Sequence, residues 1–423
     1  MSIDLGGAMP HPHIMKRRWP VLVAAGATLA GAVACSSGAA SGGRSGGSGS
    51  LACRDGRILV GIAKADSGFA SFFDVAGKRG LEVAVQEINA RGGVKGCKIQ
   101  TIAGDTKSDP AIAAQVARSL ITKGAQILVV ADDFDTGVAA ARIGQREGLL
   151  TLSLAASSTV FGKAVGDRFF SGGITTTELG LGQARYALDR KWTSTFQVLD
   201  PGLAYFTEQD AAYRRLYEGG GGKVGGVDRV DSLGGQSDFS STISKIKAAR
   251  PDVVQALAVF PAVGTFVKQL RAAGVDTPVL GNITLQTREL PKLVGAGRAD
   301  DIYYAAQVYF DGAGTDPKTD PAIATFAKTY EKMFGHFPEQ ANAPGAYQTF
   351  LAIDTALQRK DVTDAASAAK AIREQRGLKV PGGTLDQWKD GYAVWSPTIV
   401  GLEGGRFTSV TAYNATSLRS GAA

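Results

Sequence analysis

Histidine is almost absent from this 423-residue chain, which contains only three. His11 and His13 lie near the N-terminus, and His336 alone remains further along, in the stretch MFGHFPEQ. A Ser-His-Asp triad or a histidine-rich metal site would therefore depend on that one side chain. We interpret His336 as a loop residue without chemistry, and we expect no metal and no cofactor.

Concentrated positive charge is also lacking. The formal net charge is +7, from 46 lysines and arginines against 39 aspartates and glutamates. The first 34 residues hold Lys16, Arg17 and Arg18 against Asp4 alone, and the positive charge of the remainder is thinly spread. Without a basic run to neutralise phosphates, nucleic acid is an unfavourable partner.

The apolar stretch near the N-terminus is too diluted to be a good membrane span. In MKRRWPVLVAAGATLAGAVAC, from Met15 to Cys35, glycine, alanine and threonine interrupt the apolar residues. Basic residues, an apolar region and then small residues are typical of a signal peptide, which we assign to residues 1–34. Translation could begin at Met1 or at Met15.

Cysteine is scarce, and the first of the three has a distinctive context. The tetrapeptide from Ala32 to Cys35 resembles a bacterial lipobox, and SSGAASGGRSGGSGS follows it. Such a Gly/Ser segment cannot bury a core but can hold a domain away from a membrane. We therefore expect lipidation of Cys35, a lipid anchor and linker over residues 35–54, and a location on the outer face of the cytoplasmic membrane. Ordinary secretion is the alternative.

The other two cysteines, Cys53 and Cys97, each come just before a predicted strand. If these strands are parallel neighbours, their N-terminal ends lie side by side, and export permits a disulfide there. Two buried free thiols are the alternative.

From Arg57 onwards, short apolar runs alternate with amphipathic segments. ILVGIA precedes LEVAVQEINARGG, in which Leu81, Ala84, Val85 and Ile88 follow helical spacing. A second such series begins near Thr176, while the C-terminal third is mainly helical. Apolar strands alternating with helices predict parallel sheets covered on both faces, so we expect an α/β fold with two doubly wound lobes.

Two acidic or glycine-rich stretches invite other interpretations. VVADDFDTGVAAA carries Asp132, Asp133 and Asp135, but Gly144 stands where a calcium loop needs its closing glutamate. EGGGGKVGG, at residues 218–226, follows a predicted helix and precedes a strand, which is the wrong order for a phosphate loop. Neither stretch predicts a metal or nucleotide site.

GLEVAVQEINARGGVKGCKIQTIAGDTKSDPAIAAQVARSLI resembles the type I periplasmic binding proteins of the branched-chain amino acid (leucine/isoleucine/valine-binding) family. SDFSSTISKIKAARPDVV and FVKQLRAAGVDTPVLG are similar to its second lobe. The resemblance implies two lobes on a three-segment hinge, with lobe 1 at residues 55–173 and 307–380 and lobe 2 at residues 174–306 and 381–415.

The resemblance also implies where a ligand binds. Thr136 corresponds to a serine that grips the ligand carboxylate, and the loop after the next strand offers small residues. The family's glutamate, which pairs with the ligand ammonium, is replaced here by Asn282 or Ile283. One of the aspartates Asp132, Asp133 and Asp135 would then supply the charge, or the ligand is not an α-amino acid. The candidate ligand-binding residues are Phe73, Asp135, Thr136, Ala155, Ala156, Ser157, Tyr205, Phe260, Asn282 and Ile283.

The implied protein is no enzyme. It captures a small amino-acid-like or related polar or aromatic ligand and delivers it to the membrane subunits of an ABC permease, and we expect it to be monomeric. One alternative is a receptor subunit that reports a ligand to a membrane signalling protein. Another is a lipid-anchored hydrolase that uses the aspartates, although no nucleophile motif accompanies them.

Overall fold

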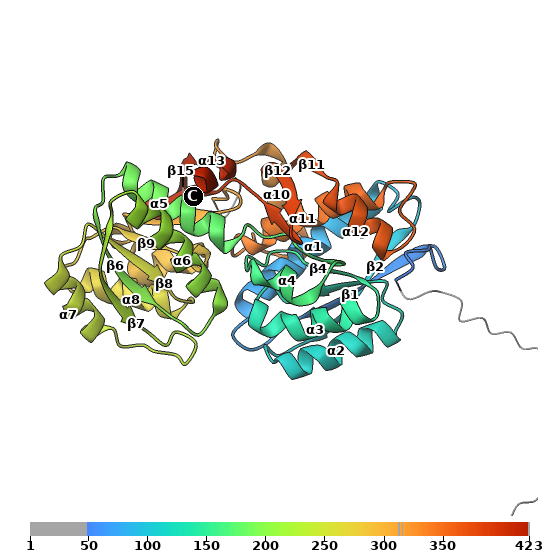
Figure 1. The fold of residues 1–423 in the computed structure, drawn as a ribbon, viewed down its shortest axis with the longest axis horizontal. Helices are drawn as coiled ribbons and strands as arrows, with labels where there is room; N and C mark the ends of the chain where they lie inside the picture. The colour runs from blue at the N-terminus through green and yellow to red at the C-terminus, as the bar shows by residue number, and fades with distance from the viewer. Residues whose placement is uncertain (1–48, 312–313, 315, 422–423) are drawn as a thin grey trace, which may run out of the picture. The chain divides into compact units, whose positions relative to one another are not determined.

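The computed structural model describes residues 49–311, 314 and 316–421. In this part of the chain the strands form two separate sheets, each flanked by helices (Figure 1). The predicted α/β fold with two parallel-rich lobes is confirmed.

The sheet of lobe 1 has the strand order β11-β12-β13-β5-β4-β3-β1-β2. Its strands are β1 (Arg57–Lys64), β2 (Lys98–Asp105), β3 (Ile127–Val130), β4 (Leu150–Ser153), β5 (Phe169–Ser171), β11 (Arg376–Val380), β12 (Gly383–Lys389) and β13 (Tyr392–Val394). The pairs from β2 to β5 are parallel, as is β13 with β5, whereas β11-β12 and β12-β13 are antiparallel.

Helices cover both faces of this sheet because its central strands are apolar on both. In β3, Ile127 and Val129 belong to one buried cluster, while Leu128 and Val130 belong to another. Helices α1 and α11 pack in the first cluster, and α2 and α3 pack in the second. The helices of lobe 1 are α1 (Ser71–Ala90), α2 (Pro110–Thr122), α3 (Phe134–Arg146), α4 (Val160–Val165), α10 (Pro321–Phe334), α11 (Asn342–Leu357) and α12 (Ala365–Arg373).

The sheet of lobe 2 has the order β15-β14-β10-β9-β8-β6-β7. It contains β6 (Ser194–Leu199), β7 (Lys223–Arg229), β8 (Val253–Leu257), β9 (Val279–Gly281), β10 (Ile302–Ala306), β14 (Thr398–Glu403) and β15 (Arg406–Ala412). Its helices are α5 (Thr176–Asp189), α6 (Ala204–Gly219), α7 (Ser240–Ala249), α8 (Ala262–Ala272), α9 (Glu289–Val294) and α13 (Ala415–Ser420), with 3-10 turns η1 (Ile283–Leu285) and η2 (Ala296–Arg298).

The described chain passes between the sheets three times, after β5, after β10 and after β13. The crossings are hydrogen-bonded to one another. Gln307 accepts from the Ile174 amide at 3.0 Å, and Trp395 Nε1 donates to the Gly172 carbonyl at 2.9 Å. Gly172 must be small, since a Cβ there would lie 1.9 Å from a Thr349 methyl group. The three crossings therefore form one linked hinge.

The C-terminal lobe boundary differs from the prediction. Residues 381–415 were expected in lobe 2, but Tyr392 pairs with Ser171 of β5, and β12 pairs with β13. Backbone hydrogen bonding therefore places residues 383–394 in lobe 1, and the chain enters lobe 2 only at β14.

The first described residues are fixed to lobe 1 rather than forming a linker up to residue 54. The Leu51 amide donates to the Thr363 carbonyl at 3.0 Å, and the Ala365 amide donates to the Gly49 carbonyl at 2.8 Å. The side-chain amide of Gln126 also donates to the carbonyl of Ser50. The first described residues are thus joined to lobe 1 by backbone hydrogen bonds at the start of α12.

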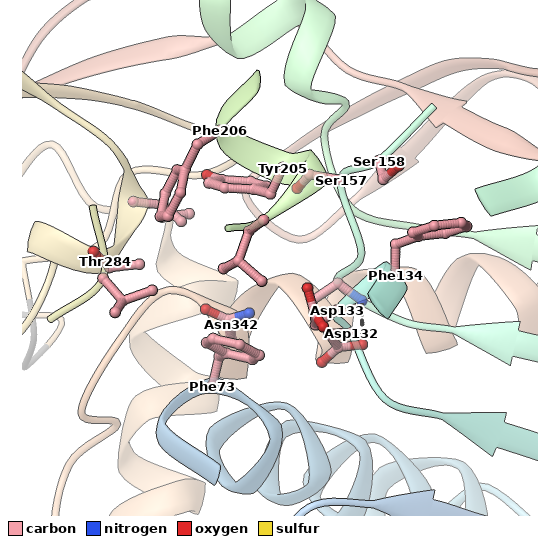
Figure 2. Close-up of a pocket in the computed structure, with 14 residues that line it drawn as sticks. Phe73, Asp132, Asp133, Phe134, Ser157, Ser158, Tyr205, Phe206, Thr284 and Asn342 are labelled. Carbon is pink, nitrogen blue, oxygen red and sulfur yellow. Dashed lines mark hydrogen bonds between the residues drawn. The ribbon is translucent and has the colours of Figure 1, made fainter. Parts of the chain in front are cut away.

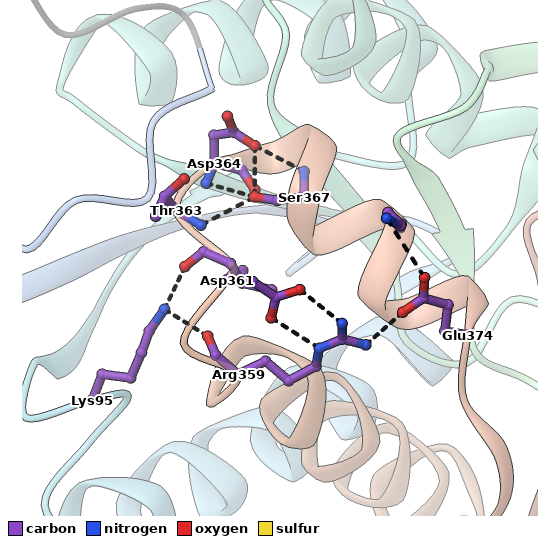
Figure 3. A network of polar contacts seen from close by, with 9 residues as sticks. Lys95, Arg359, Asp361, Thr363, Asp364, Ser367 and Glu374 are labelled. Atoms are coloured by element: carbon purple, nitrogen blue, oxygen red, sulfur yellow. Dashed lines mark hydrogen bonds and ion pairs between the residues drawn. The ribbon is translucent and has the colours of Figure 1, made fainter.

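The loop between α11 and α12, to which the first described residues are hydrogen-bonded, is held by exposed polar contacts (Figure 3). Arg359 pairs with Asp361 at 2.7 Å and with Glu374 at 2.6 Å, while Lys95 donates to the Arg359 carbonyl at 3.2 Å. Asp364 caps α12 by accepting from the amide of Ser367. Exposed pairs of this kind fix geometry more than they add stability.

Candidate ligand-binding site

A cavity opens where the carboxyl ends of strands from both sheets face each other. Lobe 1 contributes α1, the loops after β3 and β4, and the start of α11, whereas lobe 2 contributes the loops after β6, β8 and β9. The empty space is about 550 Å³, part of it open to solvent. The lining residues are Phe73, Asp132, Asp133, Phe134, Ala155, Ser157, Ser158, Leu203, Tyr205, Phe206, Val259, Ile283, Thr284 and Asn342 (Figure 2).

The walls are mainly apolar and aromatic, with a few polar groups. Phe73 and Asn342 lie on the lobe 1 side, and Tyr205 and Phe206 face them from lobe 2 (Figure 2). The Tyr205 hydroxyl lies near the Ile283 backbone, yet it is buried without a hydrogen-bond partner among the described residues. Apolar walls with a few converging polar groups are the usual composition of a small-molecule site.

Beneath the cavity, Lys64 of β1 binds two carboxylates. Its ammonium lies 2.5 Å from Asp132 Oδ2 and 3.3 Å from Asp74 Oδ1, and all three groups are buried. Burial alone would lower the pKa of Lys64, but the two carboxylates raise it above its usual range. Burial raises the pKa of Asp74, the Lys64 ammonium opposes that rise, and repulsion from Asp132 adds to it. Asp132 Oδ1 also accepts from Ser153 and the Ala155 amide, both at 3.0 Å. Asp132 is therefore held in place at the cavity wall by Lys64, Ser153 and the Ala155 amide.

Asp133 has a different environment. Its Oδ1 caps α3 by accepting from the Thr136 amide at 3.0 Å, and the residue is 6% exposed. Burial, together with repulsion from Asp135, raises the pKa of Asp133 to about 7. This carboxyl group can therefore gain or lose its proton near neutral pH.

A family model described as "Periplasmic binding protein" matches residues 57–400. The chain belongs to this periplasmic binding protein family. It is 24% identical over 355 residues to the Leu/Ile/Val-binding protein homolog 2 of Brucella abortus, covering 81% of this chain and 89% of the relative. It is 26% identical over 242 residues to the Leu/Ile/Val-binding protein of Escherichia coli, covering 56% of this chain and 64% of the relative.

Solved structures of substrate-binding proteins have the same fold. LivJ of Streptococcus pneumoniae, solved with isoleucine, gives a TM-score of 0.74 at 21% identity, over 84% of this chain and 99% of that chain. A Rhodopseudomonas palustris solute-binding protein, solved with 3,4-dihydroxybenzoic acid, gives 0.74 at 18% identity, over 85% and 98%. As a periplasmic binding protein, the chain is a substrate-binding component of transport and not an enzyme.

Five of the residues predicted for the site of this periplasmic binding protein line the cavity, namely Phe73, Ala155, Ser157, Tyr205 and Ile283. Ala156 does not line it, because it is 1% exposed and its carbonyl accepts from Ser171.

Asp135 and Thr136 lie outside the cavity lining. Asp135 is directed to lobe 2, where it accepts from the Ala204 amide at 3.4 Å. Thr136 is buried, its amide already binds Asp133, and its hydroxyl is 3.4 Å from the Asp133 carbonyl. Asp133, three residues before Thr136, lines the cavity instead.

Phe260 and Asn282 also lie outside the lining. Phe260 stacks on Phe72 of α1, with ring centroids 5.5 Å apart, so it joins the two lobes. Asn282 is fully buried; its side chain donates to the Ala258 carbonyl and accepts from the Thr284 amide, both at 2.8 Å. No carboxylate therefore replaces the family's glutamate at this position.

Several lining residues were not predicted. Phe134 lies just beyond β3, and the rule that ligands bind beyond strand ends could have selected it. Asp133 was named with Asp132 and Asp135 as a possible source of charge for the ligand, although not among the ten site residues. Leu203, Phe206, Val259 and Asn342 have no distinctive signal, since apolar loop residues and a helix-start asparagine are common.

The structure joins Cys53 and Cys97 in a disulfide, with Cα atoms 5.8 Å apart. Cys35, the predicted lipidation site, lies outside the described residues, as does the predicted signal peptide at residues 1–34. None of the described helices is both long and apolar enough to cross a bilayer. Within the same residues, no group of three or more metal-ligating side chains is suited to hold a metal ion.

Proposed function

We propose that this chain captures a small amino-acid-like or related polar or aromatic ligand in the cavity between its lobes and delivers it to the permease of an ABC importer. The observation that carries the proposal is the cavity itself, which takes its walls from strand ends of both lobes. A ligand held there contacts both lobes at once and favours their closed arrangement.

Closure has contacts of its own. Glu208 of α6 accepts from the Ser158 hydroxyl at 2.7 Å and from the Thr159 amide at 2.9 Å, both in lobe 1. The Phe72–Phe260 stack adds an apolar contact between the lobes. A ligand can shift the open–closed balance only by its differential affinity for the two forms, and contacts present only in the closed form provide that difference.

The lining residues support this range of ligand chemistry. Phe73, Tyr205, Phe206 and Ile283 suit an apolar or aromatic body, while Ser157 can bind a polar end. Similar proteins were solved with isoleucine and with 3,4-dihydroxybenzoic acid.

A thermal-shift screen of the purified full chain against amino acids, amides, polyamines and aromatic acids tests the proposal. A ligand at 100 times its dissociation constant adds about 2.7 kcal/mol of stability. Tyr205→Ala should abolish the shift caused by any hit, and Tyr413→Ala, a half-buried tyrosine outside the cavity, should keep it. A hit unaffected by Tyr205→Ala would contradict this site.

We further propose that the protein is exported, anchored through lipid on Cys35, monomeric and disulfide-bonded between Cys53 and Cys97. The lipobox-like sequence and the Gly/Ser segment after it support the anchor. Cys35→Ser should release the protein from the membrane fraction, and mass spectrometry of the wild type should find a lipid on the peptide that begins at Cys35. A membrane-bound Cys35→Ser variant would contradict the anchor.

A further inference from the structure

The charged side chains that line the cavity are both acidic. Asp132 and Asp133 contribute to the lining, and no lysine, arginine or histidine is among the described residues that do. A bound anion would therefore meet negative charge without a partner, which is costly in a buried site.

The two acids are not equally available. Asp132 is neutralised from below by Lys64, at 2.5 Å. Asp133 has no cation within ion-pair distance among the described residues, and the hydrogen bonds to its carboxylate come from Thr136 alone. Asp133 therefore presents a carboxylate without a paired cation at the cavity wall (Figure 2).

One amide at the N-terminus of α3 is also unavailable to an anionic ligand. The Thr136 amide, which could otherwise bind a carboxylate, already binds Asp133. The next carboxylate along, Asp135, adds further negative charge on the same helix turn.

The opposite walls suit a cation with an apolar body. Phe73, Tyr205 and Phe206 present aromatic rings to the cavity (Figure 2). Aromatic faces attract ammonium groups, and they also cover apolar surface.

We propose that the ligand is an organic ammonium ion with an apolar body, a hydrophobic amine, whose charged nitrogen pairs with Asp133. This inference rests on the function proposed above and makes Asp133 the residue that determines specificity. It separates this protein from relatives solved with aromatic acids, whose charge has the opposite sign.

The pairing predicts coupling to protons. The charged groups around Asp133 are Asp135 on its own helix, Asp74 on α1, and Lys64 with Asp132 below the cavity. Because burial holds the pKa of Asp133 near 7, the carboxyl is partly protonated at neutral pH. An ammonium ion binds the ionised form, so binding releases a proton from Asp133 below about pH 7, and affinity falls as the pH is lowered.

Calorimetry of the full chain at pH 8 with 2-phenylethylamine, 3-phenylpropionate and 3-phenylpropanamide tests the charge preference. We expect the amine to bind at least tenfold more tightly than the acid. Asp133→Asn, which keeps a helix cap, should weaken amine binding by roughly 30-fold or more and leave the amide nearly unchanged. Asp109→Asn, at the exposed cap of α2, is the matched control and should change nothing.

The outcomes separate the inference from the proposed function. Tighter binding of the acid, or equal amine affinity in wild type and Asp133→Asn, would overturn the inference while leaving a ligand-binding cavity. If no probe of any charge binds, and the wider screen also finds no ligand, the proposed function itself fails. Repeating the amine titration at pH 6 in buffers of different ionisation enthalpy should reveal proton release that Asp133→Asn lacks.

Discussion

Asp132, Asp133 and Asp135 follow one strand, yet each carboxylate has a different partner. Asp132 pairs with Lys64, Asp133 caps α3 and borders the cavity, and Asp135 reaches the Ala204 amide of lobe 2. The sequence alone could predict that acids lie at the end of β3, because strand ends carry ligand loops. It could not divide their roles, since Lys64 lies 68 positions before Asp132 and the contact depends on the parallel pairing of β1 with β3.

Replacing Lys64 with methionine should destabilise the protein strongly, because Asp74 and Asp132 would stay buried without their cation. We expect a loss of about 3–5 kcal/mol in the free energy of unfolding at pH 7, measured by urea denaturation. The loss should shrink as the pH is lowered, because burial raises the pKa of Asp74 and its protonated form needs no cation. Lys223→Met, an exposed lysine at the start of β7, should change stability by less than about 0.5 kcal/mol. A small loss for Lys64→Met would show that water reaches the pair.

Asp133 should make stability decrease as the pH rises. Its pKa is about 7 in the folded protein and about 4 in the unfolded chain, so the folded state binds more protons between these values. The contribution is complete below about pH 4 and is lost as the pH rises through about 7. Relative to the wild type, Asp133→Asn should gain up to about 1.4 kcal/mol per pH unit across this range. If the free energies of unfolding of the two proteins changed in parallel between pH 4 and 8, the shifted pKa would be contradicted.

At the level of elements, the parallel core of both sheets agrees with the pattern of apolar strands and amphipathic helices. The antiparallel additions, β11-β12-β13 and β14-β15, were not predicted. Strand β12, GTLDQWK, buries only Leu385 and Trp388, so its alternation is weak. Without that alternation, neither the strand nor its membership of lobe 1 could be predicted from the sequence.

Helix α6 should control closure through Glu208. Its carboxylate accepts from Ser158, Thr159 and Thr176, and charge-assisted hydrogen bonds are stronger than neutral ones. Glu208→Gln should weaken ligand binding by about 1–3 kcal/mol, or roughly 5- to 150-fold, when measured by calorimetry with a ligand from the screen. Glu218→Gln, exposed at the end of the same helix, should bind normally. Equal affinity for Glu208→Gln would mean that the α6 contact does not depend on closure.

Across the whole molecule, the lobes are joined by the hinge and by side-chain contacts from one lobe to the other. Family resemblance predicted the three-segment hinge, and it also selected Phe260, but as a wall of the ligand site. The structure instead pairs Phe260 with Phe72, a contact between residues 188 positions apart that no local pattern could reveal.

Phe260→Ala should therefore weaken binding without removing a ligand contact. Aromatic pairs contribute about 0.5–1.5 kcal/mol, so affinity should fall about 2- to 10-fold. Small-angle scattering of the ligand-saturated variant should also give a larger radius of gyration than the wild type. Val227→Ala, exposed on the edge strand β7, serves as the control. A compact liganded variant with reduced affinity would instead indicate a direct role in the cavity.

The backbone hydrogen bonds of Gly49 and Leu51 beside α12 determine which lobe an N-terminal membrane anchor would be attached to. A lipid on Cys35 would restrain lobe 1. Lobe 2 would then move relative to the membrane, because it is connected to the anchor only through the three crossings of the hinge. Relative to the membrane, ligand capture would then be a rotation of lobe 2. The permease would contact a stationary lobe 1 and a lobe 2 whose position depends on whether the cavity holds a ligand.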